Sequence, residues 1–206
     1  METSDYLSIT ALLVSLLTMW LTLFRRGTIH MTKPTQIYLG VDGGDTKKNK
    51  VYFLTLLYST GERGRIIEDL YVHLIQGESR QNFNIWAYHN SDVNMLVRGS
   101  GLFVGKTGIA TNHHFLQPKD NPTYEFRAGE YTLEVYVRLV GKKQSRLLHR
   151  TTLSISDFQA VELAKGDRGI FFDWGPGSSQ YHSHVDTKKP RGRNNGVDML
   201  LQEMLK

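Results

Sequence analysis

The sequence of 206 residues contains no cysteine. Disulfide bonds, zinc sites with cysteine ligands and thiol chemistry are therefore excluded. The chain also has little excess charge, with a formal net charge of +5 at pH 7. A mild basic balance suits the surface of an anionic inner membrane at least as well as nucleic acid. We therefore expect a membrane as a partner and no nucleic acid.

No charged residue occurs between Tyr6 and Phe24. As a helix this run is roughly 28 Å long, which is close to the hydrocarbon thickness of a bilayer. Residues 1–5 contain no Lys or Arg, and the run ends in Phe24-Arg25-Arg26 without an Ala-x-Ala cleavage pattern, which disfavours a cleaved signal peptide. The sequence thus predicts an uncleaved, single-pass transmembrane helix over residues 6–24, a signal anchor, after a short tail.

The charges that flank this helix predict its orientation. Arg25, Arg26 and Lys33 follow it, whereas no Lys or Arg precedes it. Positively charged flanks usually stay in the cytoplasm. We therefore expect the N-terminus outside the plasma (inner) membrane of a bacterium and the rest of the chain in the cytoplasm. A periplasmic domain is the alternative, because the rule is statistical and the preceding tail is short.

Small and hydroxyl side chains recur along the predicted helix at spacings of three and four residues. They are Ser8, Ala11, Ser15, Thr18 and Thr22. Such a seam lets two helices approach closely and form hydrogen bonds across the contact, which predicts self-association. Alternatively, each hydroxyl bonds a backbone carbonyl one turn earlier and needs no partner helix. The sequence leaves both possibilities open.

After a juxtamembrane linker over residues 25–35, short runs of β-branched and aromatic residues alternate with turn residues. The predicted strands are Gln36–Val41, Lys50–Ser59, Ile66–Ile75, Asn82–Tyr88, Asn94–Val97, Gly101–Val104, Tyr124–Phe126, Tyr131–Val140 and Leu147–Ser156. Regularly spaced short strands indicate an antiparallel sandwich or barrel. The sequence predicts a mainly β domain over residues 36–174.

The clearest strand pattern lies between Gly129 and Leu139. Apolar and polar residues alternate from Tyr131 onward, which predicts one buried face and one wet face. The Gly-x-Tyr pattern at its start resembles the tyrosine corner that leads into a late strand of immunoglobulin-like sandwiches. We therefore expect an antiparallel, immunoglobulin-like β-sandwich, in which a turn at Gly141 pairs this strand with the next one.

One or two short helices are predicted near the C-terminus. Ser156 and Gln159 form a capping box for a helix over residues 157–165. The apolar segment 169–174 is expected to dock on the domain. Residues 175–206 read as a flexible tail, in which Val197–Leu205 is a second, amphipathic helix that needs docking to be stable.

Two glycine-rich segments resemble phosphate-binding loops. Arg98–Thr107 resembles a Walker A loop, but Ser100 stands where that loop needs a glycine, and no helix-forming segment follows. Gly40–Lys47 resembles a phosphate loop of the sugar-kinase and Hsp70 ATPase superfamily over eight residues, in a chain too short for two such domains. Both segments are therefore predicted to be hairpin turns, in which glycine permits positive φ.

Histidine residues supply the candidate metal ligands. His182, His184 and Asp186 are spaced by two and would face one way on a strand, and His113 and His114 could add ligands for Zn²⁺ or another first-row metal. A chain with eight histidines often contains such a pattern by coincidence. The prediction is therefore no metal and no cofactor, with these residues as the candidates should a metal bind.

Several motifs carry a resemblance over most of the chain. They are Phe24-Arg-Arg-Gly27, Met31–Pro34, Gln81–Trp86, Leu96–Val104, Asn112–Phe115 and Phe172–Pro176. With them the chain resembles a bacterial family of small single-pass membrane proteins with a β-rich domain. The resemblance implies no activity, because none is known for that family.

No Ser/His/Asp set or carboxylate pair stands out in the sequence, so no catalytic residue is predicted. The expected function is a membrane-anchored, non-enzymatic interaction module with an unidentified partner protein. The alternative is a ligand- or metal-dependent sensor or enzyme that uses the histidine-rich region.

Overall fold

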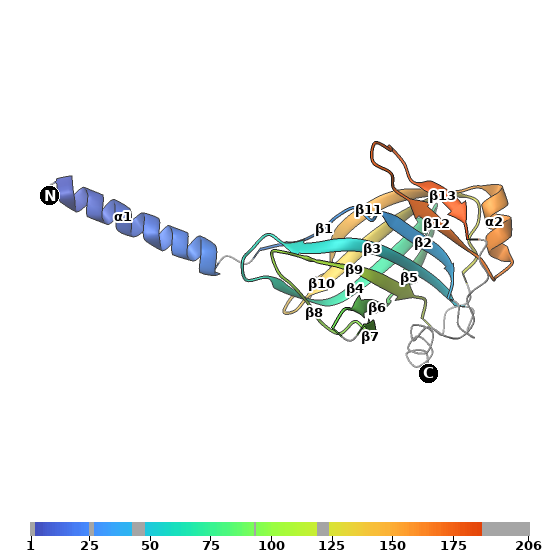
Figure 1. Ribbon diagram of the computed structural model, residues 1–206, viewed down its shortest axis with the longest axis horizontal. Coiled ribbons are helices and arrows are strands. Elements are labelled where there is room, and N and C mark those ends of the chain that lie inside the picture. Colours follow the sequence, from blue (N-terminus) through green and yellow to red (C-terminus); the bar gives the residue numbers. More distant parts are fainter. Residues whose placement is uncertain (1–2, 25–26, 43–47, 93, 119–123, 187–206) are drawn as a thin grey trace.

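The computed structural model describes residues 3–24, 27–42, 48–92, 94–118 and 124–186. Helix α1 (Thr3–Met19) continues as a π-helical turn, η1 (Trp20–Phe24). Together they form a helix that is long and apolar enough to cross a membrane, and none of its residues is buried. It projects away from the β domain (Figure 1). The helix begins before the predicted start at Tyr6, with Asp5 favourably placed near the positive end of its dipole.

The remainder of the chain is mainly β and forms two antiparallel sheets. The strands are β1 (Ile29–Met31), β2 (Gln36–Val41), β3 (Asn49–Ser59), β4 (Arg65–Gln76), β5 (Ser79–Phe83), β6 (Ile85–Asn90), β7 (Met95–Arg98), β8 (Leu102–Val104), β9 (Ile109–Leu116), β10 (Gly129–Leu139), β11 (Arg146–Ile155), β12 (Gly169–Asp173) and β13 (His182–Val185). The larger sheet has the order β13-β12-β2-β3-β9-β6-β7, with β1 also paired to β3. The smaller sheet has the order β11-β10-β4-β5, with β8 also paired to β4.

The inner faces of the two sheets form one hydrophobic core. On β10, Tyr131, Leu133, Val135 and Val137 point inward and are at most 1% exposed, which confirms the predicted alternation. Phe53 and Phe115 belong to the same core from the larger sheet. The backbone carbonyl of Arg127 accepts a hydrogen bond from the Tyr131 hydroxyl at 2.7 Å, and its N–H donates to the same oxygen at 2.7 Å. The Tyr131 hydroxyl is therefore bonded to the backbone of the segment that precedes its strand.

The chain changes sheets at two places where the sequence predicted continuous pairing. The single strand predicted over Asn82–Tyr88 is wrong, because the chain leaves the smaller sheet after β5 and enters the larger one with β6. The segment Arg98–Thr107 is likewise not a hairpin turn, since the chain leaves the larger sheet after β7, enters the smaller one with β8 and returns to the larger one with β9. The segment 40–47 does connect the paired strands β2 and β3, as predicted, although residues 43–47 lie outside the described residues.

Both predicted borders of the β domain need correction. Ile29–Met31, assigned to the linker, is β1, and His182–Val185, assigned to the flexible tail, is β13. Each is a short strand whose backbone pairs with a neighbouring strand, so its side chains need no apolar alternation. Tyr124–Phe126 is not a strand, although Phe126 is buried in the core.

One short C-terminal helix occurs in the described part of the chain, where one or two were predicted. Helix α2 (Asp157–Ala164) starts with the expected capping box: the Ser156 hydroxyl accepts from the Gln159 N–H, and the Gln159 side chain accepts from the Ser156 N–H. Gly166, with φ of 73°, follows its end. The second predicted helix, Val197–Leu205, lies outside the described residues.

Candidate functional site

The structure separates the histidines that the sequence proposed as metal ligands. His113 and His114 are on β9, whereas His182 and His184 are on β13, and Asp186 follows that strand. Four strand spacings, roughly 19 Å, lie between β9 and β13 in the larger sheet. Within the residues described, no group of three or more potential ligands is close enough to hold a metal ion.

His113 and His114 are structural parts of the larger sheet. The His113 ring is fully buried in the core, where the Trp86 indole Nε1 donates to its Nδ1 at 3.2 Å. His114 points to the opposite face and stacks on Tyr52, with ring centroids 5.1 Å apart. Burial lowers the pKa of each histidine to about 3, with the nearby Lys50 charge contributing at His114. Both rings are therefore neutral at physiological pH.

A row of rings crosses the outer face of the larger sheet. Its members in order are His184, Phe171, Tyr38, Tyr52 and His114, with centroid separations of 5.5, 4.9, 5.7 and 5.1 Å. At the β13 end, His184 Nδ1 lies 3.0 Å from a carboxylate oxygen of Asp173. The two candidate histidines on this face thus end a packed aromatic row and do not converge on a common centre.

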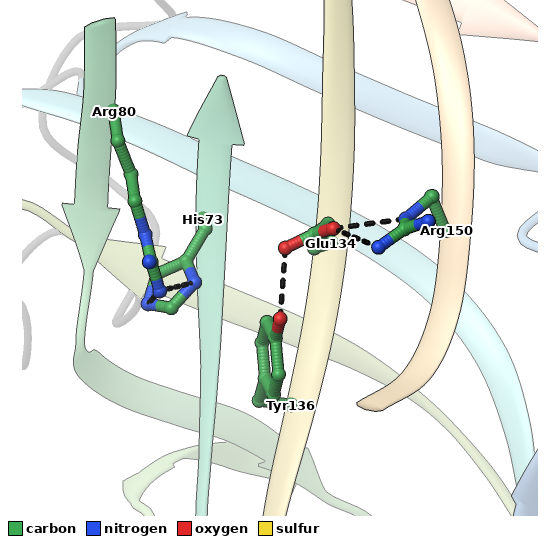
Figure 2. Close-up of polar contacts among 5 residues, drawn as sticks. All are labelled: His73, Arg80, Glu134, Tyr136 and Arg150. Carbon is green, nitrogen blue, oxygen red and sulfur yellow. Dashed lines mark hydrogen bonds and ion pairs between the residues drawn. The ribbon is translucent and has the colours of Figure 1, made fainter. Parts of the chain in front are cut away.

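The outer face of the smaller sheet carries a different polar cluster, centred on Glu134 of β10 (Figure 2). The Tyr136 hydroxyl donates to Glu134 Oε2 at 2.9 Å, and Arg150 Nε donates to Glu134 Oε1 at 2.8 Å. Burial acts to raise the pKa of Glu134, but the hydrogen bonds from Tyr136 and Arg150 outweigh it, so the pKa is lowered. The carboxylate is ionised at neutral pH, and each of its two oxygens accepts a hydrogen bond.

Beside this carboxylate, two strands contribute rings and a second arginine. Arg80 Nη2 of β5 lies within hydrogen-bond distance of both ring nitrogens of His73 of β4, 2.9 Å from Nε2 and closer to Nδ1, and donates to the unprotonated one (Figure 2). Burial, followed by the Arg80 charge, lowers the pKa of His73, so its ring accepts as a neutral imidazole. Tyr136 stacks on Tyr71 at a centroid distance of 5.3 Å and contacts His73 at 4.8 Å.

We call this cluster the smaller-sheet patch; it consists of Tyr71, His73, Arg80, Glu134, Tyr136 and Arg150. In the described residues no helix packs on this face, since α2 contacts β12 and β13 of the other sheet. The sequence identified Glu134 and Tyr136 only as members of the wet face of a strand. Their partners come from three other strands, and only the pairing of β4 and β11 with β10 and of β5 with β4 brings them together.

Three of the four hydroxyls in the candidate helix seam are bonded within the helix. Ser8 donates to the Ser4 carbonyl at 2.9 Å, and Thr18 and Thr22 donate to the carbonyls of Val14 and Thr18, each at 2.8 Å. These contacts match the alternative that needs no partner, and self-association stays a prediction.

The predicted topology-setting residues fall in two places. Arg25 and Arg26 lie outside the described residues. Lys33 lies in the segment that connects β1 to β2, and its ammonium is over the Trp174 ring, 2.8 Å from the ring centroid. Lys33 therefore also contributes a cation–π contact within the β domain.

Comparisons with known proteins return little similarity. No protein-family model and no curated protein matches the sequence. Both results are consistent with the resemblance to a family of unknown activity. A solved structure of a family 123 glycoside hydrolase from Clostridium perfringens, described in connection with glycolipid glycan hydrolysis, aligns with 8% identity and a TM-score of 0.31. The alignment covers 62% of this chain and only 27% of that enzyme, and at this TM-score it carries no argument about fold or activity.

Proposed function

We propose that this chain is a single-pass membrane protein whose β domain binds a partner protein through the smaller-sheet patch. The observation that carries the proposal is a sheet face that neither described helix covers and on which tyrosine and arginine side chains are held in fixed positions. Tyrosine and arginine dominate the binding energy of many protein interfaces. Arg150 has a side chain that is 61% exposed while its partner Glu134 is 7% exposed, so the buried carboxylate orients a guanidinium for outside contacts.

The membrane part of the proposal places the helix Thr3–Phe24 in the plasma membrane of a bacterium, with the β domain in the cytoplasm. The length and apolarity of the helix support a membrane span. The positive charges of Arg25 and Arg26 support the orientation. The periplasmic arrangement is its alternative. For the β domain we propose an immunoglobulin-like sandwich, which the Tyr131 corner supports.

Photo-crosslinking in cells tests the patch. Replacing Tyr71 with a benzophenone amino acid is expected to give one discrete adduct with another protein. Tyr52 is the matched control, because it is also a half-buried tyrosine on an outer sheet face, but of the larger sheet. Arg80→Glu is expected to abolish the adduct, because it reverses an exposed charge of the patch without removing a partner of Glu134.

The midpoint temperature of thermal unfolding of the purified Arg80→Glu variant is the control. A value equal to that of the wild type would show that the adduct is not lost through misfolding. The proposal is wrong if position 71 gives no adduct, if position 52 gives the same one, or if Arg80→Glu leaves the adduct intact.

A further inference from the structure

The contacts of the β domain begin almost immediately after the apolar helix. Only residues 25 and 26 separate Phe24 from Gly27, and a Cβ on Gly27 would lie 2.0 Å from the Gly61 nitrogen in the β3–β4 turn. The Thr28 N–H donates to the Thr60 hydroxyl at 2.9 Å, and the Thr60 N–H donates to the Thr28 carbonyl at 3.0 Å. Since a chain extends at most about 3.6 Å per residue, Gly27 lies within roughly 11 Å of Phe24.

A cavity of about 580 Å³ opens at this end of the domain, between the start of β1 and the β10–β11 turn. Its lining residues are Gly27, Thr28, Ile29, Arg65, Val137, Leu139, Lys142, Lys143, Gln144, Ser145 and Arg146. Leu139, which is partly exposed, gives it an apolar floor, and the buried side chains of Ile29 and Val137 lie beneath. Arg65, Lys142, Lys143 and Arg146 supply four cations, and the lining contains no Asp or Glu.

A second hollow at the same end combines basic and exposed apolar residues. It is lined by Arg63, Gly64, Arg65, Ile66, Phe103 and Val140. Phe103, Val140 and Ile66 are 62%, 57% and 47% exposed, and together they form a small apolar patch at this end of the domain. Basic residues beside exposed aromatic and aliphatic ones are typical of surfaces that lie on anionic membranes.

From these observations we propose that the cavity lined by Arg65, Lys142, Lys143 and Arg146 binds the phosphate headgroup of an anionic phospholipid. The cations match the phosphate, and the apolar floor matches the glycerol and the first acyl carbons. The headgroup layer is roughly 5–8 Å thick. Gly27, which lines the cavity, lies within roughly 11 Å of the end of the helix, so the cavity opens at or close to that layer. The inference rests on the anchoring of the helix in the proposed function, which makes a membrane lipid, and not free phosphate, the ligand.

The test uses the full chain in lipid nanodiscs and exploits its lack of cysteine. Gln144→Cys, at the cavity mouth, carries an environment-sensitive fluorophore, and Phe158→Cys on α2, 69% exposed, carries the same label as a distant control. Phosphatidylglycerol added to phosphatidylcholine discs is expected to shift the emission to the blue at position 144 and not at position 158.

Neutralising the cavity should remove this response. In the triple variant Arg65→Gln, Lys142→Gln and Lys143→Gln, we expect affinity for phosphatidylglycerol to fall on the order of 100-fold, because each cation near an anionic surface contributes about a factor of five. Lys106→Gln, a cation that pairs with Glu62 and is outside the cavity lining, should leave the response unchanged.

The outcomes separate the two proposals. A chain that fails to co-elute with nanodiscs overturns the anchoring itself. A chain that co-elutes but gives no phosphatidylglycerol shift at position 144, or an equal loss in Lys106→Gln, overturns the lipid site alone. An identical shift from inorganic phosphate in phosphatidylcholine discs also overturns it, because the ligand would then be a soluble anion.

Discussion

Replacing Phe53 with alanine is expected to lower the free energy of unfolding by about 3–5 kcal/mol. Phe53 is fully buried on β3, and its ring lies 5.1 Å from that of Phe115 in the core between the sheets. The substitution removes the ring and leaves a cavity in a position flanked by paired strands, where the structure cannot readily collapse. Chemical denaturation of the purified full chain in detergent, followed by tryptophan fluorescence, measures the change.

Leu54→Ala is the matched control for this prediction. Leu54 is the next residue on the same strand, but it points to the outer face and is 41% exposed, so its truncation should cost less than about 1 kcal/mol. Equal destabilisation by the two substitutions would contradict the assignment of the core to the inner faces of the sheets.

Acidification is expected to have the second large effect, through His113 and His114. The folded-state pKa of each is about 3, whereas the value in the unfolded chain is near 6.5. Below pH 6.5 these two histidines are therefore protonated in the unfolded chain but stay neutral in the folded chain. Stability that is complete above pH 6.5 falls by about 1.4 kcal/mol per pH unit for each histidine, or about 2 kcal/mol each at pH 5.

His113→Gln isolates one of these contributions. Glutamine keeps an oxygen acceptor for the Trp86 indole N–H but does not titrate. Between pH 6.5 and 5, the slope of the unfolding free energy against pH should fall by about 1.4 kcal/mol per pH unit, which corresponds to one proton fewer taken up on unfolding. Glu134 and Glu162 add their losses only below their ordinary pKa of 4.5. An unchanged slope in the variant would show that His113 is protonated in the folded chain.

The parts of the fold that could be predicted from the sequence are those where local pattern and burial agree. Alternation from Tyr131 to Leu139 located β10 and its buried face, and the capping box at Ser156 located α2. Central strand β9 escaped prediction because its inward positions include Thr111 and His113, which interrupt an apolar pattern.

The smaller-sheet patch and the basic cavity could not be predicted from the sequence, for a different reason. Glu134, Arg150 and His73 are far apart in the chain, and their contact depends on the register of β10 against β11 and β4. The basic cavity depends on Gly27 packing against the β3–β4 turn, a contact that the predicted linker did not contain. The prediction of a helix over the apolar run before Arg25 does not depend on the pairing of any strands, so composition and length were enough for it.

The central claim is that this run anchors the chain with the β domain in the cytoplasm. Fusions of alkaline phosphatase and of a fluorescent protein to the C-terminus, expressed in a bacterium and compared in the membrane fraction, test it most directly. We expect an inactive phosphatase fusion and a bright fluorescent fusion, both sedimenting with membranes. An active phosphatase with a dark fluorescent fusion would place the β domain in the periplasm, and recovery of either fusion in the soluble fraction would contradict the anchor itself.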